Sequence, residues 1–199
     1  MDAHRGQQAA EGRKSAALSS GLDPAGTLAR PALVLVEIER PHNLGAALRL
    51  CACLGLELHL VEPLGFALSD RRIREAALDY GAHLEPIRHR DAATFAGWAA
   101  RSGRRLVALS TAGALAHHRA VYRPDDLLLL GNERRGLPAE LLARAGLVVR
   151  VPMAPARRSL NLVVAGAIVA AEALRQVGAL DALERRRSTV GAEAAGEEA

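Results

Sequence analysis

The chain has 199 residues, of which 50% are hydrophobic and 3% aromatic, and its 26 basic and 22 acidic side chains give a formal net charge of +4. This length supports one sizeable core, so a two-domain enzyme is not expected, and the small basic excess is compatible with an anionic partner without proving one. Cys51 and Cys53 stand in an apolar run typical of a buried helix, which favours a reduced, cytoplasmic protein and argues against a metal site.

Strand patterns and helical patterns alternate along the chain. A strand is predicted over 32–38, a helix over 44–54, a strand over 56–62, and helices over 70–78 and 91–102 with a short strand between them near 83–87. Strands over 105–110 and 126–131, a helix over 138–145, a strand over 147–152 and a helix over 161–177 follow. Because most of these strands are apolar throughout, we expect an α/β fold with a parallel sheet covered by helices on both faces.

The two ends of the chain lack such patterns. The first thirty residues are rich in Ala, Gly, Ser and charge, and the chain ends in "GAEAAGEEA". We therefore expect one domain at 31–178, with disordered tails at 1–30 and 179–199. No run is apolar over the length of a signal peptide or a membrane span, so no membrane association is expected.

The loops that follow the strands are where ligands bind in an α/β sheet. No Gly-x-Gly-x-x-Gly follows the first strand and the Walker lysine pattern is missing, which argues against the common dinucleotide and nucleoside triphosphate folds. Three other loops carry polar residues in unusual surroundings, and each of them is a candidate site.

The first loop leads into "NLGAALRLCACLG" at 43–55, where Asn43 stands at a predicted helix cap and Arg49 is the one charged residue. A helix that is apolar on nearly all sides is expected to be buried, and a buried guanidinium has to be paired or face a ligand. Arg49 is therefore a candidate site residue. An arginine that reaches the surface along its alkyl chain, or that pairs with a core carboxylate, fits this segment equally well.

The second loop, "GNERRGLP" at 131–138, places Glu133 among four charged or amide side chains directly after an apolar strand. A solvated turn, with Pro138 in the first turn of the next helix, is the simple explanation. The third loop, "VPMAPARRSLNL" at 151–162, leads into a charge-poor helix that is typical of a core or a subunit interface. Ser159 or Asn161 could serve only as the cap of that helix.

Taken together, "NLGAALR", "LLLLGNERRGLP" and "VPMAPARRSLNL" resemble, in order and spacing, the three motifs of the SpoU-type RNA ribose 2′-O-methyltransferases of the SPOUT superfamily. The resemblance spans about 32–178, and the segment 58–80 is further similar to the single-domain branch that methylates the wobble nucleotide of tRNA. It implies a parallel α/β sheet with a carboxyl-terminal trefoil knot. It also implies S-adenosyl-L-methionine as methyl donor and a homodimer that acts on RNA. No metal is expected, since the positive sulfur of the cofactor already activates the methyl group.

Carried over position by position, the resemblance implies catalytic roles for Asn43, Arg49, Glu133 and Asn161, and cofactor contacts at Leu109, Gly131, Val151 and Ser159. An arginine almost never loses its proton, so Arg49 would act as an unusual base, stabilise a developing alkoxide, or hold a phosphate. The chain departs from the pattern at Asn132, where close relatives often have Pro or another residue, and at Val163 and Val164, where a polar residue often follows the motif Asn. These departures bear on substrate contacts.

Two other functions fit the same fold. One is a ribosomal RNA 2′-O-methyltransferase, although such relatives often carry an added RNA-binding domain. The other is a non-catalytic RNA-binding protein, which the joint presence of the motif residues disfavours. For a tRNA substrate, Arg71, Arg72 and Arg74 could bind loop phosphates, and an ordinary solvated helix face is the alternative.

Overall fold

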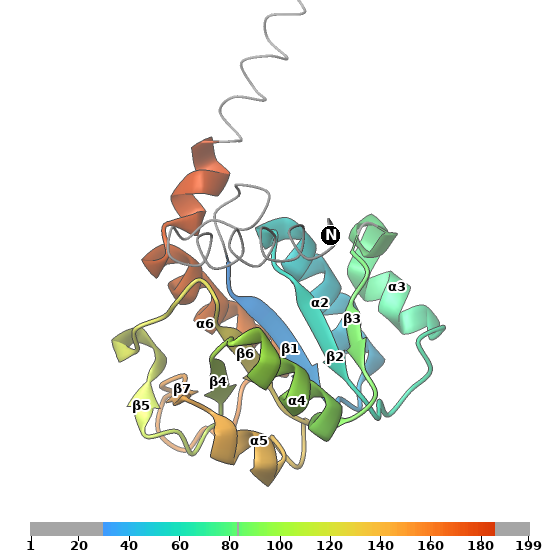
Figure 1. Cartoon of the computed structure of the whole chain (residues 1–199). Helices are drawn as coiled ribbons and strands as arrows, with labels where there is room; N and C mark the ends of the chain where they lie inside the picture. Colours follow the sequence, from blue (N-terminus) through green and yellow to red (C-terminus); the bar gives the residue numbers. More distant parts are fainter. Residues whose placement is uncertain (1–29, 83, 186–199) are drawn as a thin grey trace, which may run out of the picture.

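A computed structural model describes residues 30–82 and 84–185 of the chain. In these ranges, seven parallel strands form one sheet in the order β3-β2-β1-β6-β4-β7-β5 (Figure 1). The strands are β1 (Ala32–Val36), β2 (Leu58–Val61), β3 (Ile87–His89), β4 (Leu106–Leu109), β5 (Leu115–Ala116), β6 (Leu127–Leu130) and β7 (Leu147–Arg150).

Helices cover both faces of this sheet. One face packs on α2 (Pro41–Leu54), α3 (Arg71–Ala77) and α6 (Leu162–Gln176), and the other on α4 (Ala92–Ser102) and α5 (Ala139–Arg144). Strand residues alternate between the two cores: Leu33 and Leu35 belong to the first, and Val34 and Val36 to the second. The predicted α/β class, with a parallel sheet and helices on both faces, is confirmed.

The predicted elements all appear within a few residues of their expected bounds. The two-residue strand β5 and the short 3₁₀ helices η1 (Leu78–Ala82) and η2 (His117–Arg119) were not predicted, because they are too short to show a period. Asp70 and Asp91 cap α3 and α4 by accepting hydrogen bonds from backbone N–H groups. Pro138 lies at the N-cap of α5, one residue before the helical position that was expected.

The folded chain continues past the predicted boundary at 178. A short helix over Ala179–Arg185 follows α6, and Ala179 is fully buried in the core. The other predicted tail residues, 1–29 and 186–199, lie outside the described residues. Within the described ranges no single helix has the length and apolarity needed to cross a membrane, and one bent pair, α6 with Ala179–Arg185, meets the criterion by length and composition only.

The carboxyl ends of β4, β6 and β7 lie at one edge of the sheet because the three strands are parallel neighbours. Directly after β6 the chain folds back on itself, and Asn132 and Gly136 pair as an antiparallel bridge. Gly131 is required here: a Cβ atom at this position would lie 2.3 Å from the carbonyl carbon of Gly136. This close approach shapes the floor of the site described next.

Candidate active site

A pocket of about 440 Å³ lies at the carboxyl ends of β4, β6 and β7, a volume within the range of small-molecule sites. It is formed by the loops that follow these strands and by the start of α2. Seven of the eight predicted site residues line it: Asn43, Leu109, Gly131, Glu133, Val151, Ser159 and Asn161. The structure therefore brings together three loops that are far apart in the sequence.

The pocket has two parts of different chemistry. Strand ends and the first turn of α6 supply an apolar wall that includes Leu109, Leu130, Val149, Val151 and Leu162. Polar side chains supply the remaining wall: Arg40, Asn43, Ser110, Thr111, Asn132, Glu133, Arg134, Arg158, Ser159 and Asn161. Such a pocket can hold a flat apolar group at one side and orient a polar reacting group at the other.

A chain of side-chain hydrogen bonds connects the three predicted motifs. Asn43 Nδ2 donates to Glu133 Oε1 at 2.7 Å, and Asn161 Nδ2 donates to Asn43 Oδ1 at 3.0 Å. Glu133 also accepts from the backbone N–H groups of Glu39 at 2.8 Å and Arg40 at 3.1 Å. With both ends of its carboxamide bonded and only 2% of its surface exposed, Asn43 is held in one orientation.

Asn132 ties the second motif to the loop after β1. Its Oδ1 accepts from the backbone N–H groups of Arg134 and Arg135, and its Nδ2 donates to the carbonyl of Glu37 at 2.7 Å. The same Nδ2 lies 3.2 Å from Glu39 Oε1. Asn132 is 4% exposed, so these bonds fix the loop that carries Glu133. A proline could not make them, which gives the departure at this position a structural role.

Arg49 is the predicted site residue that the pocket does not include. Its side chain is exposed, contrary to the expected buried helix, because α2 turns Leu44, Ala47 and Leu48 to the core and leaves its Arg49 side uncovered. The guanidinium carbon lies 5.8 Å from the ring centroid of Tyr80, within the range of a cation–π contact. The alternative of an arginine that reaches the surface is the one that the structure shows for this chain.

Arg49 instead lines an open, mostly apolar groove between α2 and α6, which we call the α2–α6 groove. Its lining residues are His42, Asn43, Ala46, Arg49, Leu50, Cys53, Glu75, Ala76, Asn161, Val163, Val164 and Ala167. The groove has a volume of about 700 Å³. Asn43 and Asn161 line both the groove and the pocket. Arg49 is therefore separated by this asparagine pair from the residues predicted to contact the cofactor, which line the pocket.

The two asparagines relate differently to their helices. Asn43 was expected at a helix cap, but α2 begins at Pro41, so Asn43 lies inside the first turn and its side chain is free to bond across the site. Asn161 is the N-cap of α6 and accepts from the backbone N–H groups of Val163 and Val164. Its Nδ2 still donates to Asn43, so capping and site formation are combined in one side chain.

The SpoU rRNA Methylase family model matches residues 30–171. This chain belongs to the SpoU family. A relative from Beijerinckia indica subsp. indica named tRNA (cytidine(34)-2′-O)-methyltransferase is 47% identical over 148 residues, which cover 74% of this chain and 92% of the relative. A solved structure that concerns the 2-OH methylation of C/U34 on tRNA is 42% identical, with a TM-score of 0.70 and coverage of 75% of this chain and 91% of that chain.

A second solved SpoU neighbour is an AdoMet-bound rRNA methyltransferase from Sinorhizobium meliloti. The two chains are 29% identical with a TM-score of 0.69, and the match covers 73% of this chain and 56% of the neighbour's chain. Among the residues that the structure describes, no group of three or more His, Cys, Asp or Glu side chains is placed to hold a metal ion. The site of this SpoU chain is thus built from amide, carboxylate, hydroxyl and guanidinium groups.

Three features of this SpoU site were not assigned from the sequence. Arg40 and Arg158 line the pocket, and Asn132 organises the second motif. The signal for the arginines was their place three residues ahead of Asn43 and Asn161. By contrast, Arg71 and Arg72, which were considered as phosphate ligands, form ion pairs with Glu75 at 3.1 Å and Asp70 at 2.7 Å.

Proposed function

We propose that this chain is an S-adenosyl-L-methionine-dependent tRNA 2′-O-methyltransferase that acts on the wobble nucleotide, position 34, of the anticodon loop. The observation that carries the proposal is the Glu133–Asn43–Asn161 hydrogen-bond chain at the polar side of the pocket, which joins all three motifs of the family. The relative named for cytidine 34 supports the substrate, since the match spans 92% of its length at 47% identity.

The pocket fits S-adenosyl-L-methionine by its shape and its donor set. Gly131 lines the pocket, and its lack of a side chain lets the loop after β6 fold back against Gly136 and form one wall. Leu109 and Val151 would contact the adenine, and Ser159 offers an exposed hydroxyl. When bound, the cofactor supplies a methyl group on a positively charged sulfur. The AdoMet-bound state of the Sinorhizobium meliloti neighbour supports this assignment.

The protein residues position the ribose rather than supply a strong base. Asn43 and Asn161 present carboxamide groups beside the pocket, and the geometry holds them still, which favours an in-line approach of the 2′-hydroxyl. Glu133 serves as an anchor because its two oxygens already accept from three N–H donors. Arg49 supplies positive charge from the neighbouring groove, where it can stabilise a developing alkoxide or hold a phosphate.

We also infer a trefoil knot, a homodimer and a cytoplasmic location. The position of β7 between β4 and β5, with the loop after β7 lining the same pocket as the loops after β4 and β6, supports a threaded carboxyl-terminal segment. The uncovered α2–α6 groove supports a second copy as partner. The free cysteines Cys51 and Cys53 support a reducing compartment.

The test is to incubate the purified enzyme and labelled S-adenosyl-L-methionine with bulk tRNA and, separately, with ribosomal RNA, and to map the product. We expect 2′-O-methyl label at nucleotide 34 of a subset of tRNAs. Label in ribosomal RNA alone would favour the other enzyme function and overturn the substrate. A folded protein that binds neither S-adenosyl-L-methionine nor RNA would overturn the proposed reaction as well.

A further inference from the structure

Arg40 and Arg158 are exposed arginines at the mouth of the pocket whose guanidinium groups have no ion pair or hydrogen bond in the structure's described ranges. Arg40 is the N-cap residue of α2, and Arg158 lies in the loop between β7 and α6. Arg40 lies three residues before the first motif and Arg158 lies in the third, and both line the pocket that Asn43, Glu133 and Asn161 line. Two unpaired positive charges therefore stand at the site itself.

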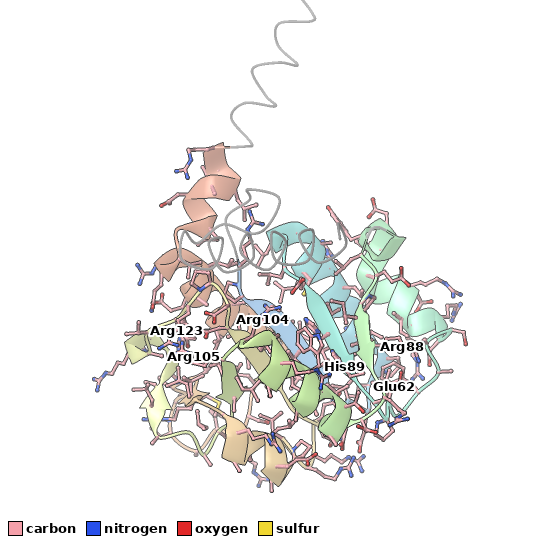
Figure 2. All side chains as sticks on the ribbon, viewed as in Figure 1. Glu62, Arg88, His89, Arg104, Arg105 and Arg123 are labelled. Atoms are coloured by element: carbon pink, nitrogen blue, oxygen red, sulfur yellow. The ribbon has the colours of Figure 1, made fainter. Side chains whose placement is uncertain are left out.

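The two arginines of the second-motif loop, by contrast, are paired with acidic side chains. Arg134 lies 3.6 Å from Glu39 Oε2, and Arg135 lies 3.4 Å from Glu37 Oε2. Away from the pocket, Arg88 on β3 pairs with Glu62, which directly follows β2, and Arg105 pairs with Asp126 at the amino ends of β4 and β6 (Figure 2). Arg40 and Arg158 thus differ from Arg134 and Arg135, because their guanidinium groups at the mouth of the pocket are not paired with an acidic side chain of the described residues.

The two arginines bracket the asparagine pair. Each stands three residues ahead of an asparagine, Arg40 before Asn43 and Arg158 before Asn161, and the two asparagines are bonded at 3.0 Å. The backbone of Arg40 is also anchored, since its N–H donates to Glu133 Oε1 at 3.1 Å. A group held against the asparagine pair therefore has one arginine on the α2 side and one on the α6 side.

We propose that Arg40 and Arg158 bind the two phosphates that flank the target nucleotide, one on each side of the ribose held at Asn43 and Asn161. This inference rests on the proposed function, because it assigns the RNA backbone to the same site. A guanidinium group matches a phosphate by two parallel N–H donors, and a ribose inside an RNA strand has one phosphate on its 5′ side and one on its 3′ side. Phosphate contacts of this kind set the register of the strand without reading its bases.

The carboxylate of the cofactor is the competing ligand for either arginine. The two assignments differ in a measurable way, since a cofactor contact affects the binding of S-adenosyl-L-methionine alone, whereas a phosphate contact affects the binding of RNA and its dependence on salt. Each phosphate contact that the protein makes to a single strand adds about 0.7 to the steepness of the plot of log K against log salt, so removing one contact makes the plot shallower by about 0.7. The slope therefore counts the phosphate contacts.

The experiment measures the affinity of an anticodon stem-loop RNA for the full-length enzyme over a series of salt concentrations. The variants are Arg40→Ala, Arg158→Ala, the double variant, and Arg123→Ala as a control. Arg123 is exposed, its side chain has no partner in the described ranges, and it lies at the opposite, amino ends of the strands (Figure 2). We expect each site variant to weaken binding roughly tenfold, the value of one hydrogen bond to a charged group, and to lower the slope by about 0.7.

A second arm replaces one phosphate next to the target nucleotide by an uncharged methylphosphonate, on the 5′ or the 3′ side. The wild-type enzyme should lose affinity for each modified RNA. For each of the two phosphates, the variant that lacks the contacting arginine should bind the modified RNA as well as the unmodified RNA. The proposal would be overturned if each methylphosphonate weakened RNA binding equally in the wild type and in both variants. It would also be overturned if the salt slopes of Arg40→Ala and Arg158→Ala matched the slope of Arg123→Ala. A weaker calorimetric affinity for S-adenosyl-L-methionine alone would assign that arginine to the cofactor instead.

The proposed function is checked in the same samples by mapping methylation with the wild-type enzyme. If each arginine variant becomes insensitive to loss of its phosphate charge but the wild type leaves nucleotide 34 unmethylated, the proposed function fails and the phosphate contacts stand. If the wild type methylates nucleotide 34 and the methylphosphonates weaken RNA binding equally in the wild type and the variants, the phosphate contacts fail and the function stands. The two failures are therefore distinguishable.

Discussion

The carboxylate of Glu133 accepts hydrogen bonds from three donors that belong to two other segments of the site, the loop after β1 and the helix α2. A neutral amide of the same shape offers only one oxygen, so at least one of these donors would face an NH₂ group. A part-buried donor that loses its acceptor is left with its desolvation cost. At the scale of single residues, the site thus depends on charge and on geometry together.

We predict that Glu133→Gln lowers the free energy of unfolding by roughly 1–3 kcal/mol, the cost of an unsatisfied buried polar group, and strongly lowers the rate of methyl transfer. The rate falls because Asn43 loses the acceptor that fixes its orientation. Thermal unfolding and a single-turnover methylation assay measure the two effects. The matched control is Glu140→Gln, which removes the same charge at the exposed start of α5. A Glu133→Gln enzyme that behaves like this control would contradict the prediction.

At the scale of elements, the edge of the sheet formed by β2 and β3 contains a buried pair of histidines. His59 Nδ1 and His89 Nε2 are 3.0 Å apart, and the two rings stack against each other and pack near Phe95 and Trp98 of α4. Burial, and the proximity of His59, lower the pKa of His89 from its ordinary value of 6.5. Glu57 lies 3.6 Å from His59 Nε2 and is itself paired with Arg104.

This pair makes folding sensitive to mild acid. Because the pKa of His89 is lower in the folded state, the unfolded chain binds more protons below the ordinary value of 6.5, and stability falls as the pH drops from there toward the folded-state pKa. We predict a falling melting temperature between about pH 7 and pH 5, measured by circular dichroism. His89→Gln should flatten this dependence, and the exposed control His42→Gln should not.

The flattening should be partial. The pKa of His117 is also lowered, by burial first and then by the neighbouring His118, so this residue contributes in the same direction. Identical pH profiles for His89→Gln and His42→Gln would show that the buried pair does not control acid sensitivity. A double variant of His89 and the half-buried His117 measures how much of the dependence the two rings explain together.

The same scale shows what the sequence could predict. The strands were predictable because a parallel sheet buried on both faces needs apolar runs such as "LLLL" in β6, and helix starts because Asp70 and Asp91 are strong caps. The loops of the site were predictable from polar residues placed after such strands. The exposure of Arg49 was not, because small residues such as Ala46 and Ala47 give α2 no clear polar face.

The partners within the site were also beyond the sequence. Asn161 is both a helix cap and a link to Asn43, and a local pattern distinguishes only the first role. The anchoring of Glu133 to the backbone of Glu39 and Arg40 joins residues more than ninety positions apart. Such contacts follow from the order β1-β6 in the sheet, which places the two loops side by side.

At the scale of the whole molecule, the α2–α6 groove is an apolar surface next to the site. Val164, on the first turn of α6, lines the groove and is 49% exposed. Arg49 and Glu75 stand among the apolar side chains of the groove. An exposed apolar surface with a few polar groups at its border is typical of a protein interface. A second copy that covers it would also enclose Arg49 beside Asn43 and Asn161.

We predict that the enzyme is a homodimer through this groove and that Val164→Asp separates the subunits, because burying an unpaired carboxylate in an apolar interface is costly. Analytical ultracentrifugation should give a monomer for Val164→Asp and a dimer for the control Val121→Asp, which alters an apolar residue that is 75% exposed outside the groove. The monomer should keep its calorimetric affinity for S-adenosyl-L-methionine, since the pocket lies within one chain, and lose methyl transfer, since Arg49 would no longer be enclosed beside the asparagine pair. A Val164→Asp monomer with wild-type turnover would show that one chain forms the complete site.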